Sequence, residues 1–338
     1  MMHLKSRRNC PYVTAVLMNW NGMSIKYKGT PLLDLCLKSL LNTEYRNLKI
    51  IVIDPGSKDN SVNFTNKLSK RINVLKEKDI NLSYETNMAI KYIVQHYNQT
   101  EYILWLNNDL IFKEKSWLKT LIDLSDSDPK IGIVGCKLLY PNNIIQHAGM
   151  TNGVAPRNLG RGEKNTSAYD GIRDVDAVSG AVMLIKKEVI EKVGLFDEHL
   201  SFGFEDVDYC LRVHKAGYRV VYAGNTSVVH LEGFTTSEAE DETKKYKSFY
   251  NYQSSYIYYG LRYFLFLGRI KVFAYALLGS IISVEGRGRA RRLTSIRIKS
   301  APLKRFIISL RAINNGYKLY LHYKHTKTLH FRAKSIDV

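Results

Sequence analysis

Short apolar runs alternate with stretches of helical periodicity along the first 240 residues of the chain. Apolar runs predict strands at 12–18, 49–53, 73–75, 102–106 and 131–135. Apolar residues at helical spacing predict helices at 32–41, 61–72, 87–96 and 117–124. Strands that alternate with helices are typical of an α/β fold built on a mostly parallel, doubly wound sheet.

Polar side chains follow three of the predicted strands directly. They form the segments 19–22, 54–59 and 107–109. The carboxyl ends of parallel strands meet at one edge of a sheet, where ligands bind in such folds. Each loop also has a local interpretation, because Asp54-Pro-Gly-Ser57 suits a turn and Asp59 or Ser61 suits a helix N-cap. The three loops together favour a binding site.

A second polar cluster lies between a predicted strand at 177–185, a helix at 187–193 and another helix at 209–217. Five carboxylates fall within twelve residues there: Asp197, Glu198, Glu205, Asp206 and Asp208. Acidic groups among aromatic residues cost solvation energy unless they bind a ligand, accept a proton or cap a helix. Capping of the following helix by Asp206 or Asp208 is the structural alternative.

Two common nucleotide-binding classes are excluded by their missing glycine motifs. No G-x-G-x-x-G motif follows the first predicted strand, as a nicotinamide dehydrogenase requires. No G-x-x-x-x-G-K-[ST] motif of a phosphate-loop NTPase is present either.

The positive charge is concentrated at the end of the chain. The whole chain carries +19, and residues 262–338 carry 17 Lys and Arg against two acids, or +15, which leaves about +4 for the rest. The four cysteines have no C-x-x-C spacing, and no apolar run follows the charged N-terminus. We therefore expect reduced thiols, no signal peptide and a cytoplasmic location.

The segment 256–282 is apolar and aromatic, but Arg262, Arg269 and Lys271 interrupt it. It has no uncharged window of ~18 residues for a spanning helix, and its composition suits a helix in the headgroup region of an anionic membrane. The basic run 287–292 adds to that attraction. The alternatives are a helical subdomain packed on the preceding domain, and nucleic acid, which no motif supports. The expected domains are 1–240, which carries the candidate site, and 241–338, which is helical and basic.

The polar segments, taken in order, resemble those of family 2 glycosyltransferases of the GT-A fold, in the rhamnosyltransferase and galactofuranosyltransferase-like branch. The matching segments cover residues 12–240: Asn19-Trp-Asn-Gly22, Asp54-Pro-Gly-Ser57-Lys-Asp59, Leu106-Asn-Asn-Asp109, Ser179-Gly-Ala-Val-Met, Gly194-Leu-Phe-Asp-Glu198, Glu205-Asp-Val-Asp208 and His230-Leu-Glu-Gly233. The sequence departs from the family at Asn107, where D-x-D has its first aspartate, at Pro55, and at 81–87, where the family has a glycine-rich loop.

The resemblance implies a role for each matching residue. Asp206 corresponds to the catalytic base with Glu205 beside it, and Asp109 and His230 correspond to ligands of a divalent metal, Mn²⁺ or Mg²⁺. Asp54 corresponds to the aspartate that contacts the nucleotide base. The residues expected to bind the nucleotide sugar are Asn19, Asn21, Asp54, Ser57, Asp59, Asn87, Asn107 and Asn108. We call the segments 19–22, 54–59 and 107–109, which contain most of them, the donor loops.

The implied activity is transfer of a sugar, with inversion, from a nucleotide diphosphate to a hydroxyl of a glycan or lipid-linked acceptor. A carboxylate general base and a hard cation at the diphosphate suit that chemistry. The enzyme is expected on the inner face of the cell membrane. The alternative is a catalytically weak sugar-nucleotide or glycan-binding protein of the same fold, which Asn107 and the altered 81–87 segment motivate.

Overall fold

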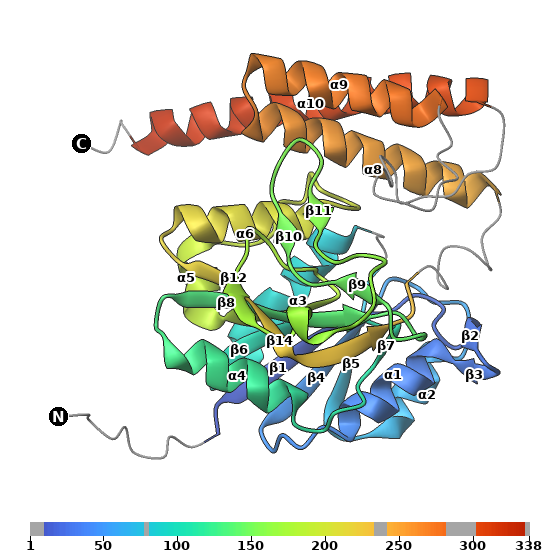
Figure 1. The fold of residues 1–338 in the computed structure, drawn as a ribbon, viewed down its shortest axis with the longest axis vertical. Coiled ribbons are helices and arrows are strands. Elements are labelled where there is room, and N and C mark those ends of the chain that lie inside the picture. Colours follow the sequence, from blue (N-terminus) through green and yellow to red (C-terminus); the bar gives the residue numbers. More distant parts are fainter. Residues whose placement is uncertain (1–9, 78–80, 233–241, 282–301, 335–338) are drawn as a thin grey trace. The chain divides into compact units, whose positions relative to one another are not determined.

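The computed structural model describes residues 10–77, 81–232, 242–281 and 302–334 (Figure 1). The chain divides into two compact units, and each is described by itself. Unit 1 contains residues 1–152, 156–197 and 206–235. Unit 2 contains residues 153–155, 198–205 and 236–338.

Unit 1 is built on a sheet in which ten strands are described, in the order β12-β14-β8-β13-β6-β1-β4-β5, with β7 beside β14 and β9 beside β8 (Figure 1). These strands are β1 (Tyr12–Met18), β4 (Leu48–Asp54), β5 (Ile72–Lys76), β6 (Thr100–Asn107), β7 (Leu110–Ile111), β8 (Ile131–Leu139), β9 (Ile145–His147), β12 (Ile172–Asp174), β13 (Val182–Lys186) and β14 (Arg219–His230). Two small hairpins add β2 (Lys26–Tyr27) with β3 (Thr30–Pro31), and β10 (Met150–Thr151) with β11 (Arg157–Asn158).

The helices of unit 1 separate successive strands, as the sequence predicts. They are α1 (Leu32–Leu41), α2 (Ser61–Leu68), α3 (Leu82–His96), α4 (Trp117–Ser127), α5 (Lys187–Val193) and α6 (Glu205–Lys215), with a 3-10 turn at Ser167–Tyr169. Alternate residues of β1 pack with the apolar sides of α1 and α4 in one core cluster, which includes Val13, Ala15, Leu17, Leu33, Leu37, Leu118 and Leu121. Helices α3 and α5 also pack against the sheet.

The predicted α/β class with its mostly parallel sheet is confirmed. Strand β1 pairs in parallel with both β4 and β6, and β4 pairs in parallel with β5. The last residues of β1, β4 and β6, which are Met18, Asp54 and Asn107, therefore lie at one edge of the sheet. Strand β13 runs antiparallel between β6 and β8, a feature that the sequence pattern did not predict.

Several predicted boundaries are wrong. The predicted loop at 81–87 is helical from Leu82, because the Asn81 side chain caps α3 by accepting a hydrogen bond from the Tyr84 amide at 3.1 Å. Helix α2 ends at Leu68 rather than residue 72, and the strand expected at 177–185 begins only at Val182. Helix α6 begins at Glu205, so the acidic cluster reaches into its first turn.

Unit 2 contains the helices α8 (Glu242–Tyr263), α9 (Phe266–Ile281) and α10 (Pro302–Lys334). Two short segments from earlier in the chain pack on α8. The Phe204 ring contacts the rings of Tyr252, Tyr256 and Tyr259 at 5.1–5.4 Å between centroids. The Tyr256 hydroxyl donates to the Val154 carbonyl at 2.8 Å. The predicted apolar stretch 256–282 is thus divided between two helices.

None of the described helices is long and apolar enough to cross a bilayer. The basic run 287–292, which the sequence analysis linked to anionic lipid, lies outside the described residues.

Candidate active site

The donor loops are joined by the side chain of Asn19, which directly follows β1. Its amide donates to the Asp54 carboxylate at 2.8 Å, and its carbonyl accepts from the Asn108 amide at 2.9 Å. All three side chains are buried. Buried polar groups need such partners, so Asn19 fixes the ends of β1, β4 and β6 relative to one another. The structure thus brings together three residues that the sequence predicted separately.

The loop after β4 is ordered by its own carboxylates. Asp54 accepts hydrogen bonds from the amides of Gly56 and Ser57, at 3.1 and 2.6 Å, and the Ser57 hydroxyl accepts from the Asn21 amide at 2.8 Å. The turn interpretation of this segment is therefore correct for its backbone. Its exposed edge remains open to a ligand, because Ser57 and Asn21 are only partly buried.

Asp59 ties the loop after β1 to the start of α2. Its carboxylate accepts from the amides of Met23 and Ser24, at 2.9 and 2.7 Å, and from the Ser61 amide at 2.9 Å. Burial would raise the pKa of Asp59, but the hydrogen bonds from Ser61 and Ser24 lower it below its ordinary value. Asp59 therefore stays ionised and holds the first donor loop against the second.

Asp109 and His230 form a buried pair beside the donor loops. His230 is the last residue of β14 and pairs with Leu110 of β7, which places its ring next to Asp109. The His230 Nε2 atom lies 3.1 Å from the Asp109 Oδ1 atom. Asn107, at the end of β6, presents its side-chain amide 3.4 Å from the same Nε2 atom.

Gln146 fixes the orientation of the His230 ring, and sequence reasoning missed it. The His230 Nδ1 atom lies 2.6 Å from the Gln146 Oε1 atom, and Gln146 Nε2 donates to the His230 carbonyl at 3.4 Å. Because Oε1 can only accept, Nδ1 carries the proton and Nε2 is the nitrogen that faces Asp109. Burial would lower the pKa of His230, but the Asp109 carboxylate raises it above its ordinary value.

The Asp109–His230 pair fits two positions of a hard-cation site. Two ligands bound at about 2.1 Å on perpendicular axes lie about 3.0 Å apart, close to the observed separation. A ring whose other nitrogen donates to a fixed acceptor is the usual form of a metal-binding histidine. Among the described residues, no three His, Cys, Asp or Glu side chains gather as a complete metal site.

Asp206 lies in the first turn of α6 with its carboxylate against the backbone that leads into β13. It accepts from the Gly180 amide at 3.0 Å and from the Val207 amide at 2.8 Å. The neighbouring Ala181 carbonyl accepts from the Asn107 amide at 3.2 Å, which connects this segment to the third donor loop. Burial raises the pKa of Asp206, although the two amide hydrogen bonds oppose the change.

Gly180 permits this close approach of the backbone to Asp206. A Cβ atom there would lie 2.9 Å from the Trp105 ring and 3.4 Å from the Asp206 Cβ atom. The adjacent Ser179 amide donates to His147 Nε2 at 3.3 Å. Burial lowers the pKa of His147 to about 4, so this ring is neutral and accepts that bond. In the sequence, Ser179-Gly180 was only one of the segments that resemble the family. Its pattern did not predict the contact between Gly180 and Asp206.

The remaining predicted residues support the site rather than line the donor loops. Asp208 is fully buried and pairs with Arg212 at 2.9 Å. Both ends of the Asn87 amide bond the Phe196 backbone, at 2.9 and 3.0 Å, so Asn87 ties α3 to the segment before α6. Glu205 is buried at the start of α6.

A mostly parallel sheet with polar loops at its carboxyl edge, a histidine–carboxylate pair and a half-buried carboxylate, Asp206, on the backbone that leads into β13 is the arrangement of the GT-A class of glycosyltransferase folds. Known structures that are similar in fold are also glycosyltransferases. A mannosyltransferase of Pyrobaculum calidifontis, solved in complex with GDP-Man and Mn²⁺, superposes with a TM-score of 0.53 over 96% of this chain and 81% of that chain, at 13% identity.

The chain belongs to the glycosyltransferase-like family 2, whose model matches residues 11–247. The family resemblance inferred from the sequence is thereby confirmed. The O-antigen biosynthesis protein RfbC of Myxococcus xanthus is 34% identical over 39% of this chain and 11% of its own length. The N-acetylglucosaminyl-diphospho-decaprenol L-rhamnosyltransferase of Mycobacterium tuberculosis is 25% identical over 63% of this chain and 76% of its own. The O-antigen chain rhamnosyltransferase WbaN of Salmonella anatum is 24% identical over 55% of this chain and 58% of its own.

Proposed function

We propose that the protein is an inverting glycosyltransferase that moves a sugar from a nucleotide diphosphate to a hydroxyl of a glycan or lipid-linked acceptor. The observation that carries the proposal is the Asn19 network, which holds the three donor loops together at the carboxyl edge of the sheet. Several relatives are named rhamnosyltransferases, so a deoxyhexose donor is the first to test.

Asp206 is the proposed general base. The acceptor oxygen attacks the anomeric carbon, the bond from that carbon to the diphosphate oxygen breaks, and the acceptor proton passes to the Asp206 carboxylate. The amides of Gly180 and Val207 hold that carboxylate in place. Burial raises its pKa, which makes the carboxylate a stronger base than an ordinary aspartate.

The donor loops are proposed to bind the nucleotide sugar. Asp54 takes the nucleotide base, with Asn19, Asn21, Ser57 and Asp59 shaping the surface around it. Asn107 and Asn108 at the end of β6 offer neutral amides to the diphosphate. Asn87 we assign to support of the segment before α6, because its amide is occupied by the Phe196 backbone.

Asp109 and His230 are proposed to hold a divalent cation, Mn²⁺ or Mg²⁺, with donor phosphate oxygens completing its ligands. Such an ion, when bound, neutralises the charge that grows on the leaving diphosphate. The one imidazole in the set suits Mn²⁺ as well as Mg²⁺. The structure of the P. calidifontis relative contains Mn²⁺, which supports the choice of metal to test first.

Gln146→Leu is expected to weaken Mn²⁺ binding about 10- to 100-fold, because the His230 ring then loses the acceptor that fixes its tautomer. Calorimetric titration with Mn²⁺ measures the change. Gln146→Glu is the matched variant, since its carboxylate still accepts from Nδ1 and should retain most of the affinity. Equal affinity in wild type and Gln146→Leu would remove Gln146 from the metal site.

The helical unit is proposed to attach to the inner face of the cell membrane, near a lipid-linked acceptor. Support comes from the +15 charge of residues 262–338 and from the exposed apolar residues of α9 and α10. Nucleic acid is the less favoured polyanion, because the chain carries no motif for it.

A panel of nucleotide sugars with Mn²⁺ tests the activity. We expect hydrolysis or transfer with at least one donor, and little with the others. Calorimetric binding of a donor, with no turnover on any acceptor, would instead support the sugar-nucleotide-binding alternative, which Asn107 motivates by standing where the family has an aspartate.

A further inference from the structure

The buried side of α10 carries small and polar side chains beside the apolar contact of Ile308 with Tyr246 and Phe249 of α8. Ser309, Ala312 and Gly316 are spaced three and four residues apart and are buried, and Gly316 lies against α8. A Cβ atom at Gly316 would lie 2.6 Å from the Ser254 carbonyl oxygen and 2.7 Å from Ile257 Cβ. The two backbones therefore approach closely, and only glycine fits this position.

The opposite side of α10 is apolar and exposed. Its apolar members, at intervals of four, three, seven and four residues, are Leu303, Ile307, Leu310, Tyr317 and Leu321, each 43–70% exposed, with the exposed Asn314 between Leu310 and Tyr317. We call them the apolar row. Of the thirteen large apolar side chains that are exposed in the described residues, ten lie between Leu265 and Leu321.

This distribution of buried small residues and exposed apolar residues is the opposite of that on a helix that faces water. A surface helix of a soluble protein turns its leucines inward and its polar residues outward. Helices that contact lipid show the opposite pattern, with small and polar residues between helices and apolar residues outside. The charges of α10 leave it without an apolar window that could span a bilayer, so the row suits a helix that lies along a lipid surface.

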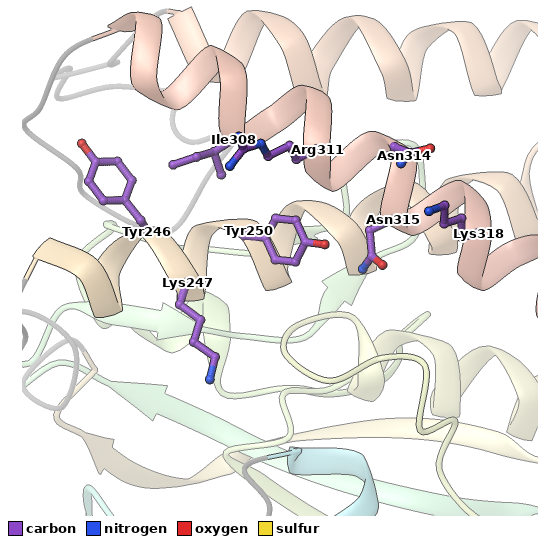
Figure 2. A pocket seen from close by; sticks show the side chains of 8 residues that line it. All are labelled: Tyr246, Lys247, Tyr250, Ile308, Arg311, Asn314, Asn315 and Lys318. Atoms are coloured by element: carbon purple, nitrogen blue, oxygen red, sulfur yellow. The ribbon is translucent and has the colours of Figure 1, made fainter.

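A basic row runs beside the apolar row. Lys304, Arg311 and Lys318 are seven residues apart, so they follow one side of α10 with only a small drift. Arg311 and Lys318 line a groove of about 510 Å³ between α8 and α10 (Figure 2). The Lys304 ammonium lies 4.1 Å from the centroid of the Tyr246 ring at the same groove.

The other groups in the groove suit a phosphate. Tyr250 projects from α8 with its hydroxyl toward Asn315 of α10, and Asn314 and Lys318 follow along the same helix (Figure 2). Asparagine amides, a phenol, a guanidinium and an ammonium all donate hydrogen bonds to phosphate oxygens. The sequences of α8, α9 and α10 together contain fourteen Lys and Arg residues and a single acid, Glu242. An anion therefore meets almost no repulsion there.

We propose that the groove between α8 and α10 binds the phosphate of an anionic lipid while the apolar row enters the surface of the bilayer. Arg311 and Lys318 are the main charged contacts, with Tyr250 and Asn315 as hydrogen-bond donors. The proposal rests on the proposed membrane attachment and makes it specific, by naming the headgroup site and the face of α10 that contacts the lipid.

The test compares two double variants of the full chain in sedimentation with vesicles of phosphatidylcholine, alone or mixed with phosphatidylglycerol. Arg311→Gln with Lys318→Gln removes the groove charges. Lys271→Gln with Lys324→Gln removes the same charge from exposed residues that do not line the groove. We expect the groove variant to lose about 30-fold in affinity for the mixed vesicles, and the control variant about fivefold or less.

The apolar row is tested by Leu310→Ser with Leu321→Ser. Both side chains are nearly half exposed, so the fold should survive, which circular dichroism checks. Wild type should stay partly bound to the mixed vesicles at high salt, and this variant should be released, because salt screens charges but not apolar contacts.

Three results would overturn the proposal. Equal losses in the groove and control variants would reduce the site to diffuse attraction. Binding of glycerol phosphate that Arg311→Gln with Lys318→Gln abolishes, with no binding of wild type to the mixed vesicles, would show that the groove takes a free phosphate ester instead of a lipid. Binding to RNA with a steep salt dependence, and none to the mixed vesicles, would assign the charge to nucleic acid. Vesicle binding needs no donor or acceptor, so it can succeed even if the proposed transfer fails.

Discussion

Asp206→Asn is expected to lower the rate of sugar transfer by about 10²- to 10⁴-fold while donor affinity changes little. The amide cannot take the acceptor proton, yet it fills the same space beside Gly180 and Val207. Transfer is measured under single-turnover conditions, and donor affinity by calorimetry. Full activity in this variant would move the base to another carboxylate.

Two neighbouring acids provide the controls. Asp208→Asn breaks a fully buried pair with Arg212, so we expect a lower melting temperature with much smaller loss of transfer per folded molecule. Glu205→Gln tests the other residue of the acid pair.

The pH profile of transfer adds an independent readout. Since the pKa of Asp206 is raised, kcat/KM should fall with decreasing pH at a value above that of an ordinary aspartate, and Asp206→Asn should lose that limb.

Asp109→Ala and His230→Ala are each expected to raise the Mn²⁺ concentration needed for half-maximal activity by at least about tenfold. Each change removes one of the two proposed protein ligands, whose facing atoms, Asp109 Oδ1 and His230 Nε2, lie 3.1 Å apart. Activity measured across a Mn²⁺ series checks the shift. His230→Gln is the milder comparison, since its amide oxygen can still bind a hard cation. Wild-type transfer that continues unchanged in EDTA would show that the reaction needs no metal.

The sequence predicted the fold class well because the strands of a parallel sheet are covered on both faces. Strand β6 reads as a continuous apolar run for this reason, and Asn107 follows it directly. The donor loops could be predicted to meet, since parallel strands carry their ends to the same edge. Asp109, Asp206 and His230 could be placed only through the family resemblance.

The partners of those residues could not be predicted, because they depend on contacts between distant parts of the chain. Gln146 reaches His230 across 84 positions through the pairing of β8 with β9 and β14. The start of α3 was missed for a local reason, since Asn81 is a good N-cap and only the expected family loop argued against a helix there. The sequence also showed that the C-terminal region is basic, but the outward side of α10 is decided by its packing on α8.

The outward leucines of α10 also govern how the isolated protein behaves in aqueous buffer. Contiguous apolar surface of this kind promotes association between molecules when nothing covers it. The high net charge of +19 opposes that association at low ionic strength, and added salt removes the repulsion while leaving the apolar contacts. The purified chain should therefore be most soluble in dilute buffer, and a mild detergent should reduce its association by covering the exposed apolar side chains of α10.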